Sequence, residues 1–177
     1  MRILGIDPGL NATGYGVILA QGGRVELVTA GTIAPPARQP LGKRLRVLYD
    51  ELARVILATQ PDTAVLEALY THHQYVTTAA LMAHARGVAC LVSAQQRLAL
   101  VDYLPTRVKK TLTGNGYASK EQVARMVAMR LGQQDPTWSL DATDALALAI
   151  AHAHFSEAPL AHTVVKPRRR ASVLASL

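Results

Sequence analysis

The chain has 177 residues, half of them apolar, a formal net charge of +7 and a single cysteine, Cys90. This length suits one compact domain with a sizeable core and is too short for two full domains. No apolar run reaches the roughly 18 residues of a spanning helix, and one cysteine excludes an internal disulfide. We therefore expect a cytoplasmic protein without a signal peptide or a membrane anchor.

The positive charge is concentrated at the end of the chain. Residues 159–177 contain four basic side chains, several small residues and no acid. Because this stretch has no hydrophobic periodicity, we expect a folded domain over residues 1–156 and a basic, disordered tail over residues 157–177. The body of the chain is basic as well, which favours a polyanionic partner, most simply a nucleic acid.

Three strand-like segments open the chain. Residues 2–7 are mostly aliphatic and end at an Asp-Pro-Gly turn, so Asp7 is expected at the end of a buried strand. Residues 13–19 and 24–33 are two further candidates, and Gln21-Gly22-Gly23 between them is a hairpin signal. The beginning of the chain thus predicts a three-stranded meander.

Helices and strands then alternate. Apolar residues recur at helical spacing from Leu41 to about Gln60, and residues 63–67 form a second buried strand. A helix between two such strands predicts that they pair in parallel. Residues 77–93 predict a helix almost free of charge, which implies burial on more than one face, in the core or in a subunit interface.

The last part of the chain predicts one more strand and three helices. The strand is expected over residues 97–103 and the helices over 105–113, over 120–131 with Ser119 as cap, and from Asp141 to about 155. The complete pattern predicts an α/β fold with a mixed five-stranded sheet flanked by helices on both faces.

Four acids lie in otherwise apolar segments: Asp7, Glu67, Asp141 and Asp144. A buried carboxylate without a partner costs several kcal/mol, roughly, unless a cation receives it. Parallel neighbouring strands would bring the first two acids together, and a spacing of three places the other two on one helix face. Since hard divalent cations prefer oxygen ligands, the pattern predicts a metal centre. The alternatives are that Asp141 caps its helix and that Asp7 is a turn residue.

Several short motifs occur in a characteristic order. They are Gly5-Ile6-Asp7-Pro8-Gly9, Thr13-Gly14-Tyr15-Gly16, Leu66-Glu67, Ala85-Arg86-Gly87-Val88, Val108-Lys109-Lys110, Gly114-Asn115-Gly116, Ala118-Ser119-Lys120 and residues 141–147. Together they resemble the RuvC family of Holliday-junction resolvases from residue 1 to about residue 156. Each motif alone is weak, but their order and spacing over a whole domain are specific.

The resemblance implies an RNase H-like fold and a homodimer that cuts four-way DNA junctions at symmetric positions in recombination and repair. It implies a bacterial cytoplasmic, nucleoid-associated enzyme that works with a branch-migration motor. The catalytic acids carried over are Asp7, Glu67, Asp141 and Asp144, with two Mg²⁺ ions per subunit and Mn²⁺ as a substitute. We expect Asp7 to bridge both ions, Glu67 to bind one, and the aspartates of the last helix to bind the other.

The segment from residue 97 to residue 130 is the most cationic part of the folded body, with seven basic residues against two acids. By resemblance Lys109 and Lys120 contact phosphate or support catalysis, and Lys110 is a neighbouring candidate. Tyr70 stands where the family commonly has an aromatic residue that stacks on unpaired bases at the crossover. Packing in the core is the alternative for Tyr70.

Three other functions are compatible with parts of this pattern. An actin-like or sugar-kinase-like ATP-binding protein also ends its first strand in Asp-x-Gly, but it needs a second domain for which the chain has no room. A non-catalytic junction-binding module would have no need of all four acids. A nuclease of the same fold that acts on RNA or on DNA ends would not require a dimer.

Overall fold

A computed structural model describes residues 1–68 and 76–157 of the protein. The elements are β1 (Arg2–Asp7), β2 (Thr13–Gln21), β3 (Arg24–Ile33), α1 (Leu41–Thr59), β4 (Thr63–Glu67), α2 (Val76–Gln95), β5 (Ala99–Tyr103), α3 (Pro105–Thr113), α4 (Lys120–Arg130) and α5 (Leu140–Glu157). The strands form one five-stranded sheet in the order β3-β2-β1-β4-β5. No helix in the described ranges is long and apolar enough to cross a bilayer.

The sheet confirms the predicted meander and the predicted crossover. Strand β1 pairs antiparallel with β2, and β2 pairs antiparallel with β3 through a turn in which Gly22 and Gly23 adopt positive φ angles. After α1 the chain forms β4, which pairs parallel with β1, and β5 then pairs parallel with β4. The carboxyl ends of β1 and β4 therefore lie side by side, at the edge where open α/β sheets place their functional groups.

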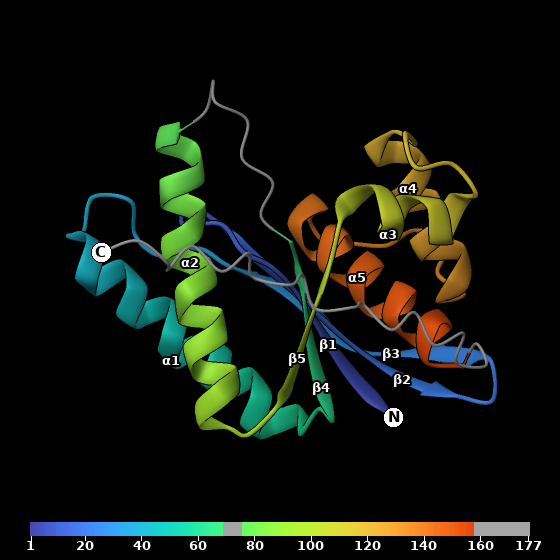
Figure 1. The fold of residues 1–177 in the computed structure, drawn as a ribbon, viewed down its shortest axis with the longest axis horizontal. Coiled ribbons are helices and arrows are strands. Elements are labelled where there is room, and N and C mark those ends of the chain that lie inside the picture. Colours follow the sequence, from blue (N-terminus) through green and yellow to red (C-terminus); the bar gives the residue numbers. More distant parts are fainter. Residues whose placement is uncertain (69–75, 158–177) are drawn as a thin grey trace, which may run out of the picture.

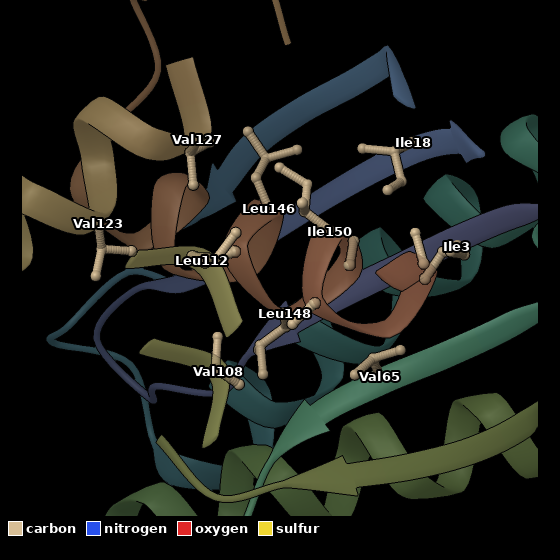
Figure 2. Close-up of a cluster of buried hydrophobic side chains, with 14 of the residues drawn as sticks. Ile3, Ile18, Val65, Val108, Leu112, Val123, Val127, Leu146, Leu148 and Ile150 are labelled. Carbon is tan, nitrogen blue, oxygen red and sulfur yellow. The ribbon is translucent and has the colours of Figure 1, made fainter. Parts of the chain in front are cut away.

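Helices cover both faces of the sheet, as predicted, with α1 and α2 on one face and α3, α4 and α5 on the other (Figure 1). Alternate side chains of the central strands point into two separate cores. Ile3 of β1 and Val65 of β4 pack with Leu146 of α5, whereas Leu4 and Leu66 pack under α1 and α2. Figure 2 shows the first of these cores.

Helix α5 lies unusually close to the strands, and glycines make this possible. A Cβ atom at Gly5 would lie 1.9 Å from the carbonyl oxygen of Ala145, and one at Gly14 would lie 1.9 Å from that of Asp141. Any larger residue would push the helix away from the sheet. Since Gly14 is the register partner of Asp7, the first turn of α5 is held directly beside the end of β1.

Helix α2 differs from its prediction, because only one of its faces is buried within the protomer. Ala85, Ala89 and Val92 are fully buried, whereas Leu91 is 53% exposed and Leu81 is 41% exposed. Burial on more than one face within the core is therefore excluded, and burial in a subunit interface stays a prediction. The composition of the helix, which is apolar on all sides, cannot distinguish a protomer core from a surface that another molecule covers.

Several element boundaries also differ from their predictions: β2 extends to Gln21, and α2 runs from Val76 to Gln95. Strand β5 begins at Ala99 instead of residue 97, because Arg97 adopts a left-handed conformation with φ of 58°. Helix α5 begins at Leu140, one residue before the predicted Asp141, and it runs through Glu157. The rest of the predicted tail lies outside the described residues.

Candidate active site

Two of the predicted acids meet at the carboxyl ends of the central parallel strands. Asp7 ends β1 and Glu67 ends β4, and the register pairs Ile6 with Leu66 immediately before them. Both carboxyls line a cavity of about 330 Å³ whose wall also includes Asp144, Lys109 and Lys120. The structure thus brings three of the four acids and two of the predicted lysines to one cavity.

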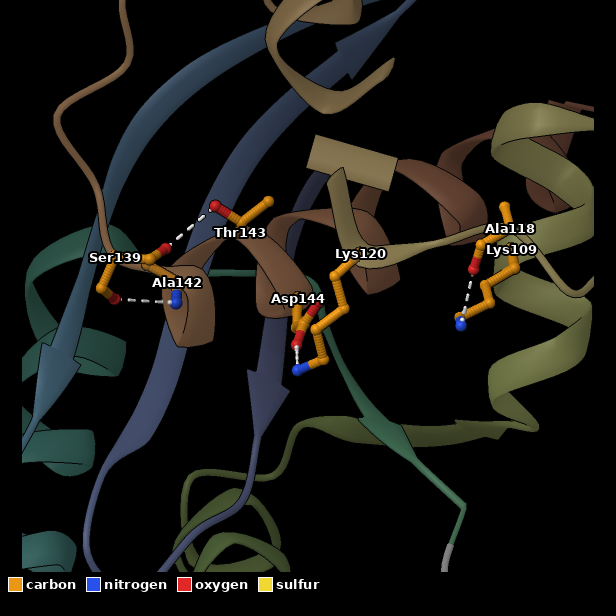
Figure 3. A network of polar contacts seen from close by, with 7 residues as sticks. All are labelled: Lys109, Ala118, Lys120, Ser139, Ala142, Thr143 and Asp144. Atoms are coloured by element: carbon orange, nitrogen blue, oxygen red, sulfur yellow. Dashed lines mark hydrogen bonds and ion pairs between the residues drawn. The ribbon is translucent and has the colours of Figure 1, made fainter. Parts of the chain in front are cut away.

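The beginning of α5 supplies the other two acids, Asp141 in its first turn and Asp144 three residues later. The Ser139 hydroxyl accepts a hydrogen bond of 3.2 Å from the Ala142 amide, and the Ser139 carbonyl accepts bonds from the amide and hydroxyl of Thr143 (Figure 3). Ser139 therefore caps the helix, and the alternative of Asp141 as cap is wrong. Asp141 lies in the first turn without lining the cavity, while Asp144 lines it.

The turn after Asp7 is fixed by other residues. The Thr13 hydroxyl donates to the Gly9 carbonyl at 2.7 Å and accepts from the Gly9 amide at 3.2 Å. The Arg44 guanidinium of α1 donates to the Leu10 carbonyl at 2.9 Å. These contacts hold the turn through other side chains, and Asp7 lines the cavity, where its carboxyl is available for chemistry.

The carboxylates at the cavity repel one another, and this repulsion affects their pKa values. Burial is the largest cause that raises the pKa of Asp7 from 3.8 to about 7; Glu67, Asp144 and Asp141 add to the rise, and Lys120 opposes it. The pKa of Glu67 is also raised, first by burial and then by Asp144. Such shifts mark a site where negative charge is concentrated and a cation would be stabilised.

The two predicted lysines of the cavity make different contacts (Figure 3). The Lys120 ammonium forms an ion pair of 2.9 Å with Asp144, and this hydrogen bond is the main cause that raises the pKa of Lys120. The Lys109 ammonium donates to the Ala118 carbonyl at 2.8 Å and so joins α3 to the start of α4. The third candidate, Lys110, lines a separate hollow with Arg107.

The donor set fits a hard divalent cation, because all four acids supply carboxylate oxygens. The two nearby lysines do not cancel the charge of four acids, so the cluster stays anionic. In residues 1–68 and 76–157, no three or more His, Cys, Asp or Glu side chains are grouped closely enough to hold one ion as they stand. The acids share one end of the sheet and interact through their charges, but they are not arranged as a finished cage.

Sequence reasoning assigned no role to Arg86, which contacts the backbone of a predicted site residue. Its guanidinium donates to the Glu67 carbonyl at 2.6 Å and to the Asp102 carboxylate at 2.7 Å, and its side chain is only 15% exposed. Arg86 therefore fixes the end of β4 from α2. The Ala85-Arg86-Gly87-Val88 motif pointed to this position without revealing what it touches. Tyr70 lies outside the described residues.

Comparisons with known proteins agree with this geometry. A model of the family described as crossover junction endodeoxyribonuclease RuvC matches residues 3–152. A protein of that name from Bordetella petrii is 46% identical over 154 residues, which cover 87% of this chain and 84% of the relative. Another, from Bradyrhizobium diazoefficiens, is 44% identical over 154 residues, which cover 87% of each chain. The structure of Thermus thermophilus RuvC in complex with a Holliday junction substrate superposes with a TM-score of 0.83 at 27% identity. The match covers 88% of this chain and 94% of that one. The fold is thus the RNase H-like fold, and the chain belongs to the RuvC family of crossover junction endodeoxyribonucleases.

Proposed function

We propose that this protein resolves four-way DNA junctions by paired, symmetric, metal-dependent cuts in recombination and repair. One observation carries the proposal: in a chain of the RuvC family, half-buried acids meet at the ends of β1 and β4, and desolvation together with the charges of the neighbouring acids raises the pKa of Asp7 to about 7. A cluster of this kind beside lysines suits a phosphodiester held next to divalent cations.

We infer that Asp7 bridges two Mg²⁺ ions, that Glu67 binds one, and that Asp141 and Asp144 bind or orient the other. Ions in such a centre supply an activated water and stabilise charge on the leaving 3′ oxygen. The protein contributes the acids, two of which are held by rigid strand ends. Small rotations of the carboxylates, with release of Asp144 from Lys120, would complete the arrangement. Mn²⁺ is expected to substitute for Mg²⁺.

We propose that Lys109 and Lys120 contact the phosphates of the cleaved strand. Both ammonium groups line the acidic cavity, so each can neutralise a phosphate beside the metal centre. Lys110 lies outside this cavity and would contact a phosphate further along the strand. We retain Tyr70 as the residue that stacks on an unpaired base at the crossover.

Paired cuts require two active sites, and we propose that α2 forms the homodimer interface. The observation that supports this is the exposed apolar face that includes Leu81 and Leu91. A two-fold dimer would present one active site to each of two symmetric strands. We further propose a cytoplasmic, nucleoid-associated enzyme that cooperates with a branch-migration motor and carries a basic tail after the nuclease domain.

The test is cleavage of a labelled four-way junction with Mg²⁺, with Mn²⁺ or with a chelator. The protein should cut two opposing strands at symmetric positions only when the metal is present, and it should leave linear duplex and RNA–DNA hybrid uncut. Asp7→Asn should bind the junction without cutting it, while Asp50→Asn on the exposed face of α1 should behave as wild type. Cleavage by Asp7→Asn at the wild-type rate would overturn the metal-centre assignment. Preferred cleavage of the hybrid would overturn the substrate.

A further inference from the structure

The loop between α3 and α4 presents an aromatic side chain almost entirely to solvent. Tyr117 is 91% exposed, more than any other large apolar or aromatic side chain in the part of the chain that the structure describes. A single exposed apolar residue needs no explanation by itself. What distinguishes Tyr117 is the rigidity of its loop and the chemistry of its neighbours.

The loop is built to hold Tyr117 in one place. Gly114 ends α3 in a left-handed conformation, and the Asn115 side chain accepts a hydrogen bond of 3.0 Å from the Tyr117 amide. The Thr113 hydroxyl donates to the Asn115 carbonyl at 2.9 Å. A Cβ atom at Gly116 would lie 3.1 Å from the Thr106 carbonyl oxygen, so the loop passes closely over the start of α3. The backbone that carries the exposed ring is therefore held in one conformation, which limits the positions open to the ring.

The neighbours of Tyr117 are cationic. Tyr117 lines an open hollow together with Arg107, Lys110 and Asn115, and this lining contains no acid. The Arg107 guanidinium carbon lies over the Phe155 ring, 4.2 Å from its centre, and 5.2 Å from the ring centre of Tyr103, and these contacts restrict its position. A fixed guanidinium and a lysine beside an exposed ring offer two anion contacts and one flat apolar contact.

The hollow is a separate pocket whose lining residues neighbour those of the active-site cavity along the chain. Residue Ala118, next to Tyr117, accepts the hydrogen bond from Lys109, and Lys120 two residues later pairs with Asp144. Lys109 and Lys110 are consecutive on α3, so one lines the acidic cavity and the other the hollow. A DNA strand with its cleaved phosphate in the cavity would pass the hollow within a few nucleotides.

We propose that Tyr117 stacks on the flat apolar face of a nucleotide in the bound DNA strand, while Arg107 and Lys110 neutralise the flanking phosphates. The inference rests on the proposed function, and it adds a contact on the strand outside the metal centre. Aromatic stacking tolerates any base, because each base has an apolar face. Tyr117 would thus position the strand for cleavage without selecting its sequence.

The test compares single variants in junction binding as a function of salt, with Ca²⁺ in place of Mg²⁺ to prevent cleavage. Tyr117→Ala should bind about 5- to 50-fold more weakly with an unchanged salt slope, and Tyr117→Phe should bind like wild type. Lys110→Ala should instead lower the salt slope by about one. Leu57→Ala, an exposed apolar residue on α1, is the matched control and should have no effect.

The outcomes separate this inference from the proposed function. If wild type binds and cuts the junction but Tyr117→Ala binds equally well, the stacking contact is wrong and the function stands. If Tyr117→Phe loses as much affinity as Tyr117→Ala, the hydroxyl is responsible and stacking is overturned. If wild type does not bind four-way junctions, the proposed function itself fails. Abasic nucleotides placed one at a time then locate the contact: a position where loss of the base weakens binding by wild type but not by Tyr117→Ala is the one on which Tyr117 stacks, and the absence of any such position would overturn stacking on a base.

Discussion

Replacing Asp7 by Asn should make the protein more stable while it removes cleavage. The reason is that the folded protein holds this carboxyl in a largely desolvated position beside three other acids. Asn has nearly the shape of a protonated Asp and carries no charge. The substitution therefore keeps the packing of the β1 end and removes the repulsion with Glu67 and the acids of α5.

The size of the gain follows from the pKa of Asp7, which rises from 3.8 to about 7. Because one pKa unit corresponds to about 1.4 kcal/mol, ionised Asp7 lowers the free energy of unfolding at pH 8 by up to roughly 4 kcal/mol. The folded-state pKa lies above the unfolded one, so this penalty is absent below about pH 4, grows toward pH 7 and is then constant. At pH 5 it should be under about 2 kcal/mol.

Urea denaturation in the presence of a chelator, followed by circular dichroism, measures this difference. Asp7→Asn should exceed wild type in free energy of unfolding at pH 8, and the gap should narrow at pH 5. Asp50→Asn removes an equal charge from the exposed pair with Arg46 and should change stability by no more than about 0.5 kcal/mol. An Asp7→Asn protein that is no more stable than wild type at pH 8 would refute the electrostatic argument.

Three further predictions concern the supports of the site and its pH dependence. Gly14→Ala places a methyl group against the carbonyl of Asp141, so it should destabilise the fold by about 1–3 kcal/mol and abolish cleavage, as thermal melts and junction assays would detect. Arg86→Gln removes the contact with the Glu67 carbonyl; a Mg²⁺ titration should show a higher half-saturating concentration for cleavage, with junction affinity unchanged. Because protons compete with the metal for an Asp7 of pKa about 7, cleavage should fall below pH 7 and recover with more Mg²⁺; a loss at pH 6 that excess Mg²⁺ does not reverse would contradict this.

Much of the fold could be predicted because local patterns left few alternatives. Helix α1 follows the meander and returns the chain across the sheet, so the parallel pairing of β4 with β1 could be predicted, and with it the neighbourhood of Asp7 and Glu67. The hairpin glycines and the Ser119 cap could also be predicted from the sequence. In the structure the Ser119 hydroxyl accepts from the Gln122 amide, and the Gln122 side chain accepts from the Ser119 amide.

The predictions that failed depend on contacts between elements that are far apart in the sequence. Ser139 and Asp141 are both good helix caps, and the close approach of α5 to Gly14 is a contact that no local pattern encodes. The apolar composition of α2 gave no means of separating a core face from an exposed one. The bond from Arg86 ends on a backbone carbonyl, and backbone acceptors leave no trace in the residue types around them.

The most direct test of the metal centre is a crystal soaked in Mn²⁺ with the anomalous peaks located. Peaks should lie within direct bonding distance of the Asp7 carboxylate, one of them shared with Glu67 and the other with the aspartates of α5. Peaks that bind elsewhere on the surface, or none near Asp7 at saturating Mn²⁺, would contradict the metal-centre assignment.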